Sequence, residues 1–318
     1  EIVFGDITAR NNETAPSCNV YISGAPCPPF SNAGLRKSLG DSRSCVLLSS
    51  VDYVLTRKPK LAIFENVSGL VNAKNKPIFN AIVKVLKTAG YKCQAQIMNN
   101  CTHGAIPRNR PRLYLVAMLE DGENPNKELP WFPDAVDCPT LQRFLVNNVK
   151  QNARLCKSAA KNVTEARRIA KKKWGKDHGL VVVDAQASAK FRAIMHGKVP
   201  CLTKARGGSN GHYIIFKYQG DGRWMNLQEI GGLQGWPKLH LDYLQQSHSA
   251  CVIGKTLGDG FCLTLWQRLF AKVLLAANLI KKKDQPPDIW VDCHKAHGHL
   301  PDAMYGADTK HEKFALWH

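Results

Sequence analysis

The sequence predicts an α/β fold built around a parallel sheet, followed by a smaller and strongly basic second domain. Between residues 18 and 119, short apolar runs alternate with amphipathic stretches, a rhythm that is typical of βαβ units. With 318 residues, 44% of them hydrophobic, the chain is long enough for two domains with cores of their own. This composition excludes collagen-like, low-complexity and mostly disordered chains.

The elements of the first domain follow from that rhythm. The pattern runs through residues 20–22, 46–55, 61–64, 78–86 and 113–119. After Pro77, four apolar side chains share one helical face, so we expect a helix that covers the sheet and ends before Gly90. These four are Ile78, Ile82, Val85 and Leu86.

The second domain begins with a change in composition. Residues 121–139 are rich in proline and carry a net negative charge, so we place a domain boundary there. Residues 151–215 then hold 14 basic and three acidic side chains, a net charge of +11. This segment carries more than half of the net charge of +19 of the whole chain. A thin apolar stripe predicts a helix with basic outer faces, and strand-like runs at 180–183 and 212–218 follow it. The stripe consists of Ala159, Val163, Ala166 and Ala170.

Charge and cysteine usage limit the class of protein. The excess of positive charge is typical of proteins that bind polyanions, with nucleic acid first among them. The alternative is a basic, well-solvated protein without an anionic partner. The apolar stretch 261–280 is interrupted by Arg268 and Lys272, which predicts a core helix rather than a membrane span. Eleven cysteines without a C-x-x-C pair favour a reducing compartment, the nucleus in a eukaryote or the cytoplasm in a bacterium, and no secretion.

The first residues also carry information. The chain begins Glu1-Ile2-Val3-Phe4-Gly5 without an initiator Met, a short apolar run that ends in a turn. We therefore expect the domain to start upstream of this sequence.

The first candidate for chemistry is Cys27, in the proline-stiffened loop 24–34 that follows the run around Tyr21. A cysteine there would lie at the carboxyl end of a parallel strand, the edge where open α/β sheets bind ligands. Flanking prolines suit a thiolate that is held at one attack angle. The alternative is a buried structural cysteine in a turn.

Two further runs add polar groups. Glu65 follows the apolar run 61–64, and its carboxylate would hydrogen-bond the ring nitrogen and amino group of a heterocycle, or else cap the next helix. Arginines at alternate positions in 107–114 share one side of an extended chain. Two guanidinium groups on one side suit a phosphate or a polarised carbonyl oxygen, and the alternative is a solvated edge.

In this order and spacing, the runs around Cys27, Glu65 and the arginines resemble the C5-cytosine methyltransferase family. Further stretches are similar to other family motifs, and the resemblance covers residues 1–280. It implies a Rossmann-like S-adenosylmethionine-dependent methyltransferase sheet with a smaller, basic target-recognition domain. The further stretches are Gly5-Asp6-Ile7-Thr8, residues 40–46, residues 223–237 and Leu257-Gly258-Asp259-Gly260.

The same resemblance implies four segments. Residues 1–137 would form the catalytic domain without its first βαβ unit, and 138–240 the target-recognition domain. Residues 241–280 would return to complete the catalytic domain, and 281–318 would form a tail without an assigned role. We expect a monomer that acts on duplex DNA and does not associate with membranes.

The resemblance also implies roles for individual residues. Cys27 would attack C6 of a cytosine flipped out of the duplex, Glu65 would bind N3 and the exocyclic amine, and Arg112 would steady O2. The methyl group would come from S-adenosyl-L-methionine, and no metal is expected. The implied catalytic set is Cys27, Glu65, Arg110 and Arg112. The implied cofactor contacts are Asp6, Ile7, Pro26, Val46 and Asp259. The implied DNA contacts are Ser31, Arg43, Lys204 and Arg206.

Departures from the family pattern keep other hypotheses open. Arg108 stands where the family usually has Gln, Asp259 stands where it usually has Asn, and the family's glycine-rich cofactor loop would precede the first residue. A non-catalytic DNA-binding fragment is one alternative. A tRNA cytosine methyltransferase is another, although its branch has a compact recognition domain. A tail cluster of Cys293, His294, His297 and His299 fits no common zinc spacing.

Overall fold

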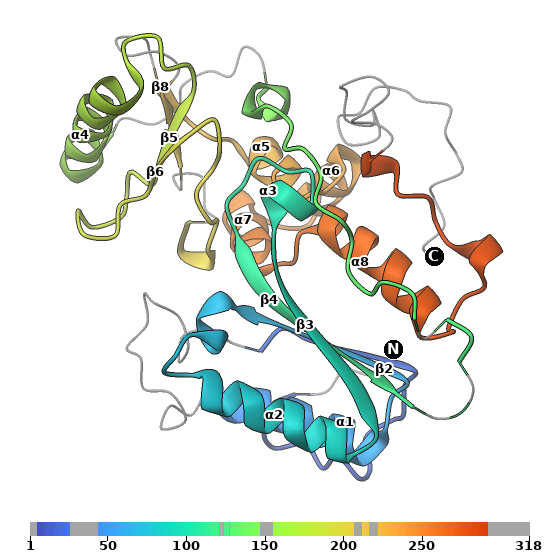
Figure 1. The fold of residues 1–318 in the computed structure, drawn as a ribbon. Coiled ribbons are helices and arrows are strands. Elements are labelled where there is room, and N and C mark those ends of the chain that lie inside the picture. Colours follow the sequence, from blue (N-terminus) through green and yellow to red (C-terminus); the bar gives the residue numbers. More distant parts are fainter. Residues whose placement is uncertain are drawn as a thin grey trace. The chain divides into compact units, whose positions relative to one another are not determined.

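The computed structural model describes residues 5–25, 44–120, 122, 124–126, 128–146, 155–206, 212–215 and 222–291. Their contacts divide the chain into two compact units (Figure 1). The first unit comprises Glu1–Met98, Pro111–Pro133 and Leu269–Pro287, and the second comprises Asn99–Arg110, Asp134–Arg268 and Asp288–His318. The domain boundaries at 137/138, 240/241 and 280/281 stay predictions.

The first unit contains a four-stranded sheet in the order β1-β2-β4-β3. Its strands are β1 (Val20–Ser23), β2 (Leu61–Val67), β3 (Tyr91–Asn99) and β4 (Pro111–Leu119). β1 pairs parallel with β2, whereas β4 pairs antiparallel with β2. The sheet is therefore mixed rather than wholly parallel, because the connection through residues 100–110 is shorter than a parallel crossover requires.

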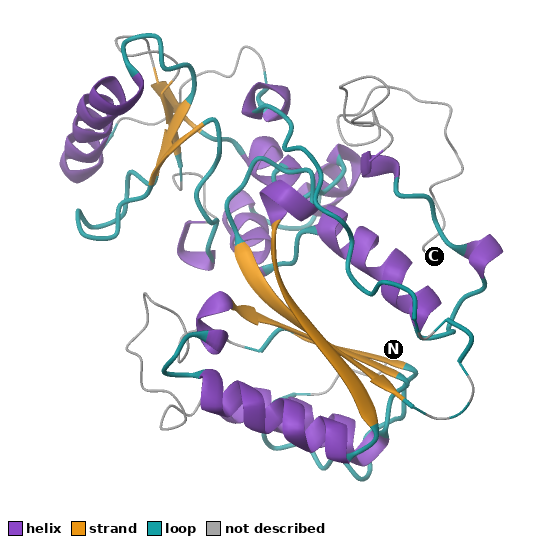
Figure 2. Ribbon diagram, viewed as in Figure 1, coloured by secondary structure: helices purple, strands orange, loops and turns teal. Residues whose placement is uncertain are grey.

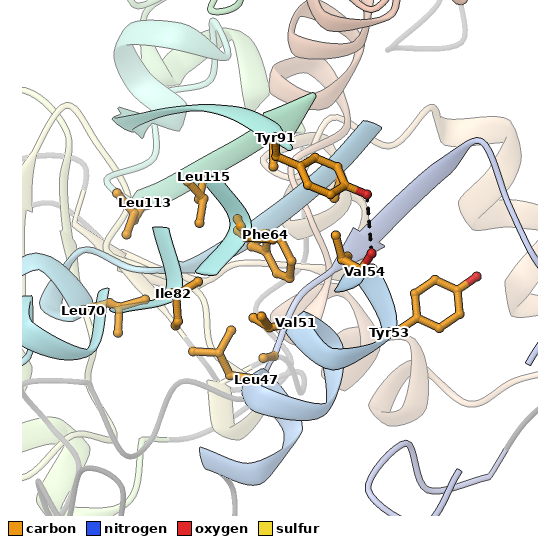
Figure 3. Packing of buried hydrophobic residues seen from close by; sticks show 14 of the residues in the cluster. Leu47, Val51, Tyr53, Val54, Phe64, Leu70, Ile82, Tyr91, Leu113 and Leu115 are labelled. Atoms are coloured by element: carbon orange, nitrogen blue, oxygen red, sulfur yellow. Dashed lines mark hydrogen bonds between the residues drawn. The ribbon is translucent and has the colours of Figure 1, made fainter. Parts of the chain in front are cut away.

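Helices α1 (Ser44–Arg57) and α2 (Lys76–Thr88) contribute to the core of this unit, with a 3₁₀ turn at η2 (Ser68–Val71) (Figure 2). Leu47, Val51 and Val54 of α1 pack in one buried cluster with side chains from the strands (Figure 3). Tyr91 at the start of β3 is also buried, and its hydroxyl donates to the Pro59 carbonyl at 2.9 Å. One buried aromatic thus joins the edge strand to the turn before β2.

The α2 helix differs in one detail from the prediction. Ile82 and Leu86 are buried and Ile78 is half-buried, but Val85 is 43% exposed. The expected apolar face is therefore narrower than the sequence suggested, because the helix needs only an i, i+4 pair to cover its part of the sheet. The helix ends before Gly90, whose φ of +91° favours glycine.

The second unit has its own sheet, in the order β6-β5-β7-β8 with antiparallel pairing throughout. Helix α4 (Lys157–Trp174) packs on this sheet through the predicted stripe, and all four stripe residues are buried beside Val181 and Val183. The strands are β5 (Val181–Val183), β6 (Ile194–His196), β7 (Tyr213–Ile215) and β8 (Gly222–Trp224).

The remaining helices of the described residues have ten residues or fewer, apart from α8. They are α3 (Asn100–His103), α5 (Leu227–Gly232), α6 (Lys238–Gln245), α7 (Ala250–Asp259) and α8 (Leu263–Ala276), with 3₁₀ turns η3 (Leu141–Phe144), η4 (Lys204–Arg206) and η5 (Lys282–Asp284). The prediction of a core helix in 261–280 is confirmed by α8, where Leu265, Leu269 and Val273 are fully buried. None of the helices in the described part of the chain has the length and apolar content that a membrane crossing requires.

Candidate catalytic and cofactor site

Glu65 lies in β2, directly after four buried apolar residues, and is itself only 5% exposed. In the register with β4, Glu65 lies opposite Tyr114, and Val67 lies opposite Arg112. Paired residues, and residues two apart along a strand, share one face of a sheet, so Glu65 and Arg112 project from the same face. The Arg112 Nε atom lies 3.2 Å from Glu65 Oε1. The structure thus brings two of the predicted catalytic residues together.

This ion pair has a specific chemical capacity. A buried carboxylate requires a partner, and the Arg112 guanidinium supplies the opposite charge at hydrogen-bond distance. A carboxyl group can accept from an amine and share a proton with a ring nitrogen, while a guanidinium group can donate to a carbonyl oxygen. Side by side, the two groups match the polar edge of a pyrimidine base.

Arg110, also predicted to be catalytic, binds backbone within the second unit. Its Nη1 donates to the carbonyl oxygens of Leu202 and Gly258 at 3.0 and 3.3 Å, and its Nη2 donates to that of Gly260 at 3.4 Å. Arg110 is 7% exposed. These contacts give it a structural task, and its catalytic role stays a prediction.

Gln234 supports the same backbone, and the sequence pattern had pointed to no individual role for it. It is fully buried and donates to the carbonyl oxygens of Leu257 and of Gly260, the latter at 2.9 Å. The available signal was a polar residue between Leu233 and Gly235 in an otherwise apolar and glycine-rich run. Gln234 and Arg110 together fix the end of α7.

The predicted cofactor contacts are only partly described. Asp6 is exposed, and its Oδ1 accepts from the Thr8 backbone nitrogen and hydroxyl at 2.8 Å each, which lowers the pKa of the carboxyl group. Ile7 beside it is half-buried, as is Val46 on α1. A carboxylate next to an apolar side chain fits the amino group and ring of a purine. Asp259 instead pairs with Lys204, 3.1 Å away. All of these cofactor assignments stay predictions.

Of the predicted DNA contacts, Lys204 and Arg206 lie on η4 and both form ion pairs. Arg206 Nε donates to both carboxylate oxygens of Asp184, at 2.8 and 3.0 Å. Burial raises the pKa of Asp184, and the neighbouring Arg206 opposes that rise. Four predicted site residues lie outside the described residues, namely Pro26, Cys27, Ser31 and Arg43.

The predicted tail cluster also lies outside the described residues. It consists of Cys293, His294, His297 and His299. Within the described ranges, no group of three or more His, Cys, Asp or Glu side chains is arranged to hold a metal ion.

The buried His212 should make the free energy of unfolding depend on pH. His212 is 1% exposed, and its ring nitrogens have no hydrogen-bond partner among the described residues. Burial, assisted by Arg108 and Arg206, lowers its pKa from 6.5 to about 3. The unfolded chain therefore binds one more proton than the folded chain between these values, so stability falls as the pH drops from 6.5. One proton corresponds to about 1.4 kcal/mol per pH unit.

We expect His212→Leu to flatten this acid dependence. Urea midpoints measured at pH 7, 6, 5 and 4 should fall less steeply for the variant than for the parent chain. Exposed His248→Leu is the matched control and should keep the parental slope. Parallel curves for the parent and the His212 variant would contradict this assignment.

Comparison with known proteins decides the family. The model of the C-5 cytosine-specific DNA methylase family matches residues 1–274. The chain belongs to this family. Its members are cytosine C5-methyltransferases, so the resemblance seen in the sequence and the predicted fold class are both confirmed. This family generally uses S-adenosylmethionine.

The relatives match part of the chain. The chain is 31% identical over 121 residues to the orphan methyltransferase M.SPRI of Bacillus phage SPR, which is 38% of this chain and 27% of the relative. It is 34% identical over 133 residues to the type II methyltransferase M.Bsp6I of Bacillus sp. strain RFL6, 41% of this chain and 42% of the relative. The matched region therefore spans less than half of either relative.

Solved structures show the same fold. The Entamoeba histolytica methyltransferase EhMeth aligns with a TM-score of 0.56 and 18% identity, over 86% of this chain and 83% of its own. The Dnmt2 methyltransferase of S. pombe aligns with a TM-score of 0.55 and 17% identity, over 85% and 83%. At this identity the likeness concerns the fold.

Proposed function

We propose that this chain is a methyltransferase that acts on DNA and transfers a methyl group from S-adenosyl-L-methionine to C5 of a flipped cytosine. The observation that carries the proposal is the ion pair of the buried Glu65 with the half-buried Arg112, on adjacent strands of a chain that belongs to the cytosine C5-methylase family. The concentration of basic residues in 151–215 supports a polyanionic substrate.

Each residue of the proposed mechanism has one task. The Cys27 thiolate forms a bond to C6 of the extruded cytosine, while the Glu65 carboxyl holds N3 and the exocyclic amine and Arg112 donates to O2. The ring then becomes nucleophilic at C5. When bound, S-adenosylmethionine would supply the methyl group that C5 takes up. Loss of the C5 proton to solvent would restore the double bond between C5 and C6 and expel the Cys27 thiolate.

Asp6 and Ile7 are the described residues that we assign to one end of the cofactor. Asp6 would accept a hydrogen bond from its exocyclic amine, and Ile7 would contact its purine ring. Val46 on α1 would add a second apolar contact. We also assign Asp259, whose carboxylate pairs with Lys204 at 3.1 Å, to the cofactor.

Trapping on a duplex that contains 5-fluorocytosine tests this function, because a C5 fluorine cannot leave as the proton does. We expect a denaturation-resistant adduct that forms only when S-adenosylmethionine is present. Cys27→Ser should abolish it, and Cys18→Ser, which changes an exposed cysteine of the first unit, should not. Methyl transfer to tRNA but not to duplex DNA would contradict the DNA assignment, and DNA binding without any adduct would leave only a binding protein.

A further inference from the structure

The loop between β5 and β6 presents an aromatic side chain to solvent. Phe191 is 58% exposed, and the Lys190 ammonium lies 5.6 Å from the centre of its ring. Arg192 follows directly, so the tip reads Lys-Phe-Arg. This run of an aromatic between two basic residues was not singled out in the sequence. A lone exposed apolar residue is ordinary, so the significance of Phe191 depends on its surroundings.

The loop that carries Phe191 is firmly attached to α4. The buried Asn162 side chain donates to the carbonyl oxygens of Ala185 and Ala187 at 2.8 Å each, and accepts from Arg192 Nη1 at 2.7 Å. The loop is closed at its base, where the Asp184 nitrogen donates to the Ala193 carbonyl at 3.0 Å. A side chain on such a support meets a partner with little loss of conformational freedom.

Helix α4 adds a row of positive charge beside this tip. Lys157, Lys161, Arg168 and Lys172 are exposed and recur at helical spacing, opposite the buried apolar stripe. The only acidic residue of the helix is Glu165, which pairs with Arg168 at 2.7 Å. At about 1.5 Å per residue the row is about 22 Å long, which corresponds to about six base pairs of duplex DNA.

One residue connects the row to the tip. Arg192 contacts Asn162 of α4 and also acts electrostatically on Glu165, one turn further along the helix. The loop that carries the tip is therefore a neighbour of α4. Figure 1 shows β5 and β6 beside this helix.

The residues that the sequence suggested for DNA contact are engaged differently. Lys204 and Arg206 are held in ion pairs with Asp259 and Asp184. The α4 row, in contrast, has one carboxylate for four cations. Its charge complements a polyanion, and phosphate contacts together with an apolar contact to bases are the usual division of labour in DNA binding.

We propose that this face, the α4 row with the Phe191 tip, binds duplex DNA, the row through phosphates and the Phe191 ring through bases. The inference rests on the proposed DNA substrate. It assigns that substrate a surface separate from the residues predicted on η4.

The row is tested by salt dependence. The variant for this test is the full chain with three substitutions, Lys157→Gln, Lys161→Gln and Lys172→Gln. It should bind a 30-base-pair duplex more weakly than the parent chain. Its plot of log affinity against log salt should be less steep by about one for each phosphate that the variant no longer binds. The matched control changes three exposed lysines of α2, Lys76, Lys84 and Lys87, to Gln and should leave the slope unchanged. Circular dichroism confirms that α4 remains folded. An unchanged slope for the α4 variant, or an equal loss for the α2 variant, would overturn the proposal.

The tip is tested by a contact that salt does not affect. Phe191→Ala should weaken binding at least about fivefold while the salt slope stays the same, because the contact involves bases rather than phosphates. Phe191→Tyr should restore binding, since it keeps the ring. Leu239→Ala, which removes a 77% exposed side chain from α6, is the control and should have no effect. Equal binding by Phe191→Ala and the parent would refute the role of the tip.

These outcomes are separable from those of the proposed function. Binding that depends on the row and the tip, in a chain that forms no 5-fluorocytosine adduct, would support the surface and refute the enzyme. If the 5-fluorocytosine adduct forms, and neither the α4 variant nor Phe191→Ala changes adduct formation or DNA binding, the enzyme is supported and the surface is refuted. An effect seen with tRNA and absent with duplex DNA would overturn both.

Discussion

Replacing Glu65 by Gln is expected to reduce methyl transfer by about a hundred- to ten-thousand-fold, the range that general acid–base groups contribute. Gln has nearly the same shape and keeps an oxygen beside Arg112, whose Nε atom lies 3.2 Å from the carboxylate of the parent chain. It cannot share a proton with N3 of cytosine. The loss should therefore appear in kcat, measured as methyl incorporation under saturating DNA and cofactor.

Two controls separate this loss from a defect in folding. Glu120→Gln makes the same change at an exposed position in the first unit and should leave the rate unchanged. Thermal melting shows whether the Glu65 variant keeps its fold, since the buried pair also bears on stability. A folded Glu65→Gln protein that retains parental kcat would remove Glu65 from the mechanism.

The second large effect concerns stability of the second unit. Glu229 is 1% exposed and accepts from Nη1 and Nη2 of Arg223, from Nη1 at 2.8 Å. It also accepts from the backbone nitrogens of Val146 and Asn226, at 2.9 and 3.0 Å. The last contact forms half of a capping box, because Asn226 in turn accepts from the Glu229 nitrogen. One carboxylate thus joins β8, α5 and the segment after η3.

Glu229→Gln should lower the free energy of unfolding by about 3–5 kcal/mol, because it leaves the Arg223 charge buried without the opposite charge of Glu229. Urea unfolding followed by circular dichroism measures this loss. Glu165→Gln breaks an ion pair that is exposed on α4, and little change is expected from it. If the Glu229→Gln variant is as stable as the parent chain, the ion pair of Arg223 and Glu229 does not contribute to the free energy of unfolding.

The family, and the segments that carry the candidate site residues, could be predicted from the sequence alone. The apolar run Leu61–Phe64 predicted a buried strand with Glu65 directly after it, and the structure extends this strand to Val67, so that Glu65 lies within it. Periodicity placed the four small residues of α4 on its buried face, and all four are buried. Such local patterns are legible because apolar spacing follows directly from helix and strand geometry.

Other features were missed or misjudged for physical reasons. β3 was not expected, since its edge position leaves polar and apolar residues mixed along it, with Gln94 and Ile97 both exposed. The parallel sheet proved mixed because the direction of β4 is set by the length of its connection. The two arginines of one motif, Arg110 and Arg112, look equivalent in sequence, yet one binds backbone carbonyls and the other binds Glu65.

The sequence by itself determined the fold class, the family and the residue types at the candidate site, because these depend on local spacing and on motifs. Tertiary structure alone decided how the charges are paired. It joined Arg112 to Glu65, Arg206 to Asp184 and Lys204 to Asp259, across separations in the chain that no local pattern encodes. Whether a charged side chain binds a ligand or another residue depends on which groups folding brings within hydrogen-bond distance.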